Sequence, residues 1–239
     1  MLKQEWAINN FKQDIIEFEN FVSITTDTGR MYKTPKGMIY PSVTTALSMM
    51  SKQAIIEWRK RIGEEEANKI TRQATRRGTN LHNLLEKYLM NDYNYGKGQM
   101  PSDLDLFYKI KTVLDKNVTL IRGQEFPLYS DVMKIAGRCD LLCDYDGELS
   151  VVDFKSAAKE KKEEYILNYY YQATAYCLMI KELKNIDVKQ FYIIIASEQP
   201  AAQVFRGEVS RYRDECIEYF TNYYNIQNYN QETLKQLYG

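Results

Sequence analysis

Apolar and polar positions alternate with a helical period in the first third of the chain, which predicts a largely α-helical region there. A short segment around "DTG" and "TPKG" interrupts this pattern with two small hairpin turns. Gly78 suits the end of one helix and Thr79 the N-cap of the next. The helices expected in this part of the chain span 1–20, 43–50, 52–76, 80–90 and 102–116.

The middle of the chain changes to a strand-like pattern of short apolar runs between turn residues. We expect strands at 119–129, 132–145 and 149–155, a helix at 163–182, two further strands, and a helix from about 209. Strands mixed with helices in this order indicate an α/β fold. We expect a helical and hairpin region over 1–78 and a core over 79–239, together forming one compact unit.

The stretch "CDYDGELS" predicts a tight hairpin, because an Asp-Gly pair between alternating strands favours a two-residue type I′ turn. If Asp146 and Gly147 form the turn, Asp140 stands directly opposite Asp153. A shift of one residue would place Asp140 on the other face.

Two acids facing each other repel, so their juxtaposition needs a reason. A divalent cation between Asp140 and Asp153 is the simplest one, since Mg²⁺ is typically held by one or two carboxylates. Lys155 shares a strand face with Asp153 because positions i and i+2 point the same way. The alternative is a solvated face in which Lys155 and Arg138 neutralise the acids.

Two helices carry further candidates. His82, the single histidine of the chain, lies at the edge of an apolar stripe and is either a packed residue or a metal ligand. Gln172 and Tyr176 lie one turn apart on the helix after the Lys155 strand, where they either face the core or contact a ligand.

Bulk composition excludes some classes of protein. The 239 residues carry 32 basic and 32 acidic side chains, so attraction of nucleic acid requires a local patch. Residues 51–80 hold eight basic and four acidic side chains, which is either a solvated helix face or a surface that follows a phosphate backbone. The four cysteines lack zinc spacing, and neither a signal peptide nor a membrane span is recognisable, which predicts a cytoplasmic protein without membrane partners.

Several short motifs, taken in order, resemble those of a known family. "HNLLE", "GRCD", "VVDFKSA" and "QATAY" resemble the RecB-like branch of the PD-(D/E)XK nucleases. "YPSVTTALSMMSK" and "RRGTNLH" further resemble the mitochondrial genome maintenance exonucleases and related phage exonucleases. The resemblance covers roughly residues 30–205 and implies a restriction-endonuclease-like core, in which a mixed sheet is flanked by helices.

The resemblance also implies roles for individual residues. Asp140 and Asp153 would be catalytic metal ligands, completed by His82 and the backbone carbonyl of Phe154, with Lys155 as the catalytic lysine. Gln172, Tyr176 and Arg77 would hold the substrate. Glu125 would support the substrate or a second metal ion, unless it is an ordinary strand-edge glutamate.

The function implied is a metal-dependent DNA exonuclease that uses Mg²⁺ or Mn²⁺ and prefers single-stranded DNA with free ends, in a bacterial or phage-infected cell. Some relatives carry an iron–sulfur cluster held by four cysteines, but here no cysteine precedes His82, so we expect no cluster. A structure-specific or restriction-type endonuclease would share the motifs. A non-catalytic DNA-binding recombination module would not need Asp140, Asp153 and Lys155 together.

Overall fold

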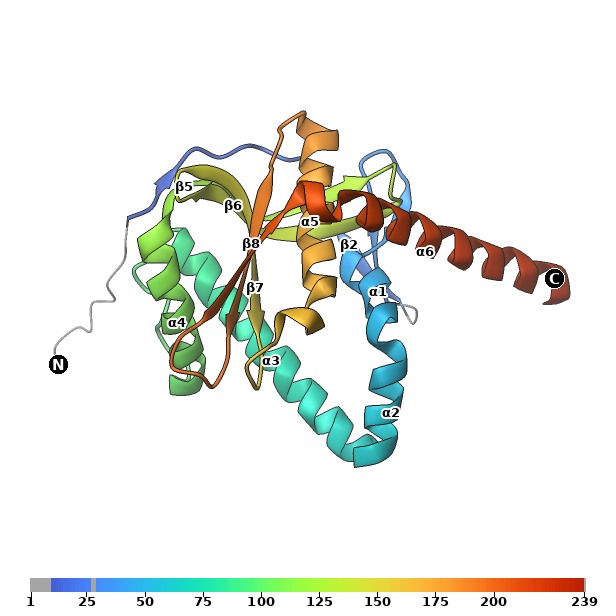
Figure 1. Cartoon of the computed structure of the whole chain (residues 1–239), viewed down its shortest axis with the longest axis horizontal. Coiled ribbons are helices and arrows are strands. Elements are labelled where there is room, and N and C mark those ends of the chain that lie inside the picture. The colour runs from blue at the N-terminus through green and yellow to red at the C-terminus, as the bar shows by residue number, and fades with distance from the viewer. Residues whose placement is uncertain (1–9, 27–28, 239) are drawn as a thin grey trace.

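A mixed β-sheet covered by helices on both faces forms the body of the protein (Figure 1). The computed structural model describes residues 10–26 and 29–238, with side chains as far as residue 227. In these residues six strands lie in the order β1-β5-β6-β7-β8-β9. The strands are β1 (Lys12–Gln13), β5 (Val118–Ser130), β6 (Ile135–Tyr145), β7 (Glu148–Ser156), β8 (Gln190–Ala196) and β9 (Gln203–Glu208).

The sheet is built from a three-stranded antiparallel meander, a crossover and a hairpin. Strands β5, β6 and β7 run antiparallel in succession, β7 and β8 are parallel, and β8 and β9 form the hairpin. Helix α5 (Leu167–Lys184), preceded by a short 3-10 turn at Glu163–Tyr165, makes the crossover that a parallel pair requires. This strand and helix order confirms the α/β prediction.

Each sheet face has its own apolar core. One core joins the sheet to α5, to α6 (Val209–Tyr238) and to α1 (Val43–Leu47). The other joins the opposite face to α3 (Glu64–Leu89) and α4 (Pro101–Asn117). Consecutive residues of β8 separate accordingly, because Ile193 belongs to the first core and Ile194 to the second.

A second, three-stranded sheet lies before α1. It contains β2 (Ser23–Thr26), β3 (Gly29–Lys33) and β4 (Ile39–Pro41), all antiparallel. A bridge between Ser42 and Ala136 of β6 attaches this small sheet to the large one. The expected "TPKG" turn joins β3 to β4 in this layer beside β6, whereas residues 27 and 28 of the expected "DTG" turn lie outside the described structure.

The helix expected over 1–20 is not present in the described part, residues 10–20. The chain there is extended and pairs with β5, with the N–H of Asp14 donating to the Ile121 carbonyl at 2.9 Å. Phe11 packs edge-on against Tyr88 of α3, with ring centroids 5.3 Å apart. These tertiary contacts outweigh the helical pattern, and residues 1–9 lie outside the described structure.

The expected helix boundary at Gly78 is also wrong. The break falls at Gly63, whose φ of +88° separates α2 (Lys52–Ile62) from α3, and α3 then continues through Gly78 to Leu89. Glycine in a helix interior costs only about 1 kcal/mol relative to alanine, which the buried leucines of α3 outweigh. The proposed division after residue 78 therefore falls inside a helix.

Helix α2 and the first half of α3 form an arm that projects away from the sheet, and the second half of α3 packs against the sheet (Figure 1). A 3-10 turn at Ser48–Ser51 joins α1 to α2, and no residue of α2 is buried. Among the described residues, no helix combines the length and apolar character that crossing a bilayer would require.

Candidate active site

A pocket of about 270 Å³ opens where the sheet meets α3 and α5. It gathers side chains that lie far apart in the sequence and that the motifs single out. Those lining it are His82 from α3, Glu125 from β5, Asp140 from β6, Lys155 from β7, and Gln172 and Tyr176 from α5. The expected site residues therefore converge from five different elements.

The predicted register of the β6–β7 hairpin is confirmed as far as the ladder extends. Tyr145 pairs with Glu148, and the ladder continues to Leu141 opposite Val152. Asp140 and Asp153 follow directly beyond the last recorded pair. There the carboxylate of Asp140 accepts a hydrogen bond from the backbone N–H of Phe154 at 2.8 Å.

Strands β5 and β6 are both distorted at Glu125 and Asp140. Leu141 belongs to the α3–α4 core and Cys139 to the α5–α6 core, although residues two apart in a regular strand share a face. Glu125 has a φ of +47°, and its carbonyl oxygen accepts a hydrogen bond from the guanidinium of Arg138. Distortions of this kind re-aim side chains beside active sites, and here they direct both carboxylates toward α3.

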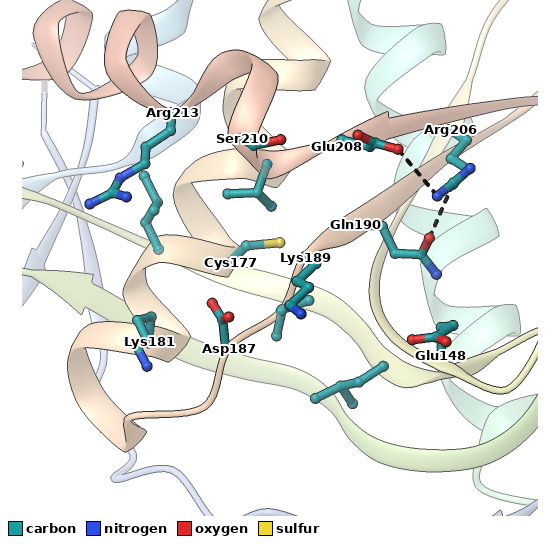
Figure 2. A pocket seen from close by; sticks show the side chains of 14 residues that line it. Glu148, Cys177, Lys181, Asp187, Lys189, Gln190, Arg206, Glu208, Ser210 and Arg213 are labelled. Carbon is teal, nitrogen blue, oxygen red and sulfur yellow. Dashed lines mark hydrogen bonds and ion pairs between the residues drawn. The ribbon is translucent and has the colours of Figure 1, made fainter.

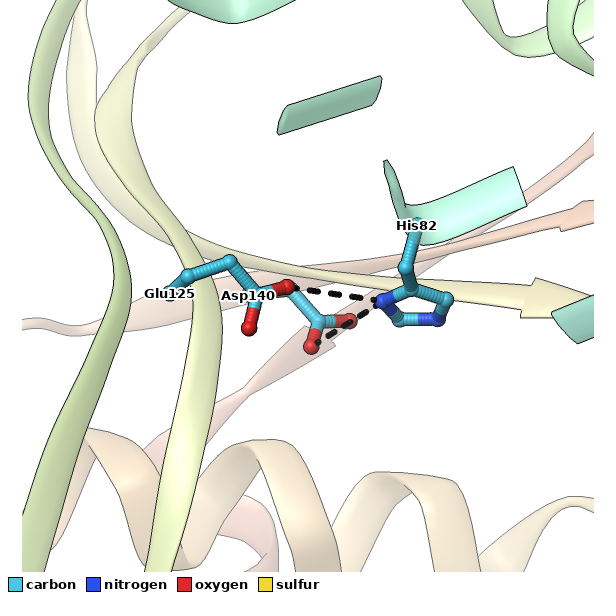
Figure 3. A group of neighbouring side chains, drawn as sticks. All are labelled: His82, Glu125 and Asp140. Carbon is cyan, nitrogen blue, oxygen red and sulfur yellow. Dashed lines mark ion pairs between the residues drawn. The ribbon is translucent and has the colours of Figure 1, made fainter. Parts of the chain in front are cut away.

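His82, Glu125 and Asp140 form a group that could hold a metal ion (Figure 3). Their potential ligand atoms all lie within 4.8 Å of one another. The Nδ1 atom of His82 is 3.6 Å from an oxygen of each carboxylate. Its Nε2–H donates to the carbonyl oxygen of Phe154 at 3.1 Å, because a carbonyl can only accept. This bond fixes the ring with Nδ1 facing the acids.

The electrostatics of this group favour positive charge. The negative charge of Asp140 raises the pKa of His82 to about 9, against the opposing effect of burial. Burial raises the pKa of Asp140 itself, while His82 and Lys155 counteract part of that rise. Without a metal ion, the proton on His82 supplies the positive charge that two neighbouring carboxylates require.

Asp153 and Lys155 form a buried ion pair beside this group. Burial raises the pKa of Asp153 to about 6, and the charge of Asp140 adds to the effect. Burial alone would lower the pKa of Lys155, but the charges of Asp153 and Asp140 raise it. The ammonium also lies 5.2 Å from the ring centroid of Tyr169, so Lys155 is held as a cation.

The two α5 residues stand behind Asp153. Gln172 donates a hydrogen bond from Nε2 to Asp153 Oδ1 at 2.8 Å, and the Tyr176 hydroxyl lies 3.5 Å from the same nitrogen. Tyr176 approaches the backbone of β6 closely, because a Cβ atom at Gly137 would lie 2.7 Å from its Cε1 atom. The glycine of the "GRCD" motif therefore leaves room for the tyrosine of the "QATAY" motif.

Three expected site residues do not line the pocket. Asp153 and Phe154 bond directly to residues that do, but the third, Arg77, stands apart. It lies on α3, and its buried Nε has no hydrogen-bond partner among the described residues. The pocket instead includes two arginines to which the sequence assigned no role in binding, Arg30 of β3 and Arg138 of β6. In the sequence, the positive charge of each side chain is the one signal that could have marked Arg30 and Arg138 as binding residues.

A larger cavity of about 850 Å³ lies elsewhere, between the second half of α5, the start of α6 and strands β8 and β9 (Figure 2). It shares no lining residue with the first pocket. Its charges nearly balance, with Arg206 bonded to Glu208 and Gln190. The charged residues that line this cavity are Lys181, Lys189, Arg206, Arg213, Glu148, Asp187 and Glu208.

The fold and this site define a nuclease. The family model of the PD-(D/E)XK nuclease superfamily matches residues 104–237, and the chain belongs to this superfamily. Its core is accordingly restriction-endonuclease-like, and members of the superfamily use divalent metal ions. The match begins after His82, so the histidine helix stands outside it.

Comparison with individual proteins adds less. A proposed exonuclease from Eubacterium rectale shares 13% identity and a TM-score of 0.42, over 62% of this chain and 63% of that one. The protein SSO0001 shares 13% identity and a TM-score of 0.32, over 59% of this chain and 73% of the other. The chain thus spans less than two thirds of the Eubacterium rectale structure. No curated protein matches the sequence.

Proposed function

We propose that the protein is a metal-dependent DNA exonuclease that degrades single-stranded DNA from free ends. The observation that carries this proposal is the group of His82, Glu125 and Asp140 next to the Asp153–Lys155 ion pair, in one pocket of a nuclease fold. In metal-dependent phosphodiester hydrolysis a divalent ion activates the attacking water and a positioned cation stabilises developing negative charge, and this arrangement offers sites for both.

The donor atoms suit Mg²⁺ or Mn²⁺. Two carboxylates and one imidazole are ligands that these ions accept, and Nδ1 of His82 faces both acids. The group in the structure is His82, Glu125 and Asp140, and we propose Asp153, which lies beside it, as a further ligand once an ion is bound. The Phe154 carbonyl has a second lone pair, so it can bind an ion while accepting from His82. A bound ion would lower the pKa of a coordinated water and polarise the scissile phosphate.

Lys155 acts as the fixed positive charge of the site. Its raised pKa keeps the ammonium protonated at neutral pH, so it donates hydrogen bonds to the attacking water or to a phosphate oxygen. Asp153 holds this ammonium in place, and Gln172 in turn holds Asp153. These contacts orient the charge before the substrate arrives, which removes the cost of reorganisation during the reaction.

The arm formed by α2 and the first half of α3 supports single-stranded DNA as the proposed substrate. It extends away from the sheet, and His82 lies at its base on the second half of α3, so a strand that follows the arm leads to the site (Figure 1). Part of its charge is neutralised internally, since Arg59 pairs with Glu64 and Lys69 with Glu66. The remaining basic side chains, among them Arg77, are proposed to follow the phosphate backbone.

The experiment that tests this proposal compares two substrates of one sequence. End-labelled linear single-stranded DNA and a closed single-stranded circle are incubated with Mg²⁺ or Mn²⁺. We expect the linear strand alone to be degraded. Labels at the 5′ and 3′ ends then give the polarity. Cutting of the circle would replace the exonuclease assignment by an endonuclease.

Two variants make the result specific to the site. Asp153→Ala should abolish degradation, whereas Glu148→Gln, at the exposed end of the same strand, should retain it. Binding of DNA without cleavage by the wild-type protein, with either metal ion, would contradict the catalytic assignment. It would favour a binding module instead.

A further inference from the structure

The pocket of about 270 Å³ has a second wall, made by residues outside the candidate metal group, to which the sequence assigned no role in binding. This wall comes from the small N-terminal sheet and the start of α1. It contributes Arg30, Ser42 and Thr44 to the lining. The volume is slightly below the ~300 Å³ at the small end of ligand pockets, so the pocket suits a group of about the size of one nucleotide.

The wall is built rigidly onto the core. Ser42 caps α1 by accepting a hydrogen bond from Thr45 N at 2.9 Å, and its own N–H donates to the Arg30 carbonyl at 2.8 Å. Gly29 has a φ of +125°, and a Cβ atom there would lie 2.6 Å from Thr45 Cγ2, so β3 lies directly against α1. Residues of α1 are buried in the α5–α6 core. Arg30 and Thr44 therefore project from a fixed surface.

The chemistry of this wall suits an anion. Arg30 is exposed, and no carboxylate pairs with it among the described residues. Thr44 is exposed and lines the pocket, and its hydroxyl, 3.0 Å from the Ser42 hydroxyl, can form a further hydrogen bond. Guanidinium and hydroxyl groups are the side chains that most often contact DNA phosphates, and arginine does so with two parallel hydrogen bonds.

We propose that Arg30 and Thr44 form a phosphate-binding subsite for the nucleotide next to the scissile bond. This inference rests on the proposed function, because the metal group in the same pocket fixes where the scissile phosphate would lie. The small N-terminal sheet then has a binding role, in that it clamps the strand while α3, β5, β6 and β7 carry out the reaction.

The test measures binding separately from cleavage. A fluorescent single-stranded oligonucleotide is titrated with protein in the presence of a chelator, over a series of salt concentrations. We expect Arg30→Ala to weaken binding about tenfold, as loss of a charged hydrogen bond does, and to lower the salt slope by about one. Thr44→Val, which keeps the shape, should weaken binding about threefold. Lys33→Ala, a charge removed from the same strand outside the pocket, should leave the slope unchanged.

A neutral phosphate locates the contact. Single methylphosphonate linkages are placed in turn along the oligonucleotide. One position should weaken binding to the wild-type protein about tenfold and have no further effect on Arg30→Ala. The subsite would be overturned if the Arg30→Ala substitution and the methylphosphonate linkage weakened binding independently at every position. It would also be overturned if Arg30→Ala bound DNA with the same affinity and salt slope as Lys33→Ala.

Failure of the proposed function gives a different result. If the wild-type protein binds DNA with this position dependence but does not cleave it with Mg²⁺ or Mn²⁺, the subsite stands and the nuclease assignment falls. If the wild-type protein cleaves DNA but the substitution and the methylphosphonate weaken binding independently at every position, the nuclease assignment stands and the subsite falls. Thermal unfolding of Arg30→Ala should match that of the wild-type protein, because the side chain is exposed.

Discussion

Gly137 is the position at which a single methyl group should separate folding from catalysis. A Cβ atom there would lie 2.7 Å from Cε1 and 2.9 Å from the hydroxyl oxygen of Tyr176. Tyr176 is 2% exposed and lies among core residues, so it has little room to retreat. Overpacking of this kind costs about 1–3 kcal/mol.

The consequence for activity follows from the contacts of Tyr176. Its displacement moves Gln172, whose amide holds Asp153, and Asp153 in turn holds Lys155. A misplacement of about 1 Å in a catalytic group can lower the rate about a hundredfold. We therefore expect Gly137→Ala to lose about 2–12 °C in Tm, at 2–4 °C for each kcal/mol, and most of its nuclease activity.

Two other glycines supply matched controls. An added Cβ at Gly207 would overlap the ring of Phe191, which does not line the catalytic pocket, so Gly207→Ala should lose stability but keep its activity below Tm. At Gly78 the nearest atom would be Ser156 Oγ at 3.8 Å, an ordinary contact. Gly78→Ala should therefore gain about 0.5–1 kcal/mol from helix propensity.

The assays are calorimetric or fluorescence-monitored unfolding and degradation of labelled DNA, both on the same preparations. The reasoning would be refuted if Gly137→Ala unfolded and cleaved like the wild-type protein. It would also be refuted if Gly207→Ala lost as much activity as Gly137→Ala at equal distance below Tm, because the loss would then reflect instability alone.

Three further results are expected from the candidate metal group. An ion at a hundred times its Kd should stabilise the wild-type protein by about 2.7 kcal/mol, and Asp140→Asn should abolish this gain in thermal unfolding. Because the pKa of His82 is raised from 6.5 to about 9, its protonation stabilises the metal-free fold fully below pH 6.5, and this contribution is lost as pH rises through 9. Denaturant midpoints measured in chelator should therefore fall between these pH values, and a His82→Gln protein whose midpoints fell equally would contradict this. Lys155→Ala should reduce cleavage by about 10²–10⁴-fold while calorimetry still detects metal binding, and loss of both would assign the lysine a structural role.

Local signals were sufficient to predict the centre of the fold. The Asp146–Gly147 turn fixed the register of β6 on β7, because an Asp-Gly pair between alternating strands permits few other arrangements. The helix before these strands and the crossover after them also lie close to their expected positions. Each of these features depends on residues that are near one another in the sequence.

The N-terminal third depended on contacts that the sequence pattern does not show. Residues 10–20 lie extended because their backbone bonds to β5, about a hundred residues away. Helix α3 continues through Gly78 because the leucines that follow this glycine are buried against α4 and the sheet. In both places tertiary packing decided between local alternatives.

Glu125 shows most clearly what the sequence could not supply. Its carboxylate reaches His82 because its backbone adopts a left-handed conformation, which Arg138 stabilises through the Glu125 carbonyl oxygen. A strand-edge glutamate in regular geometry would have had no reason to face Asp140. Left-handed backbone costs a non-glycine residue about 1–3 kcal/mol, and a fold retains such strain where surrounding contacts enforce it. The strain at Glu125 therefore argues that its carboxylate belongs to the same site as His82 and Asp140.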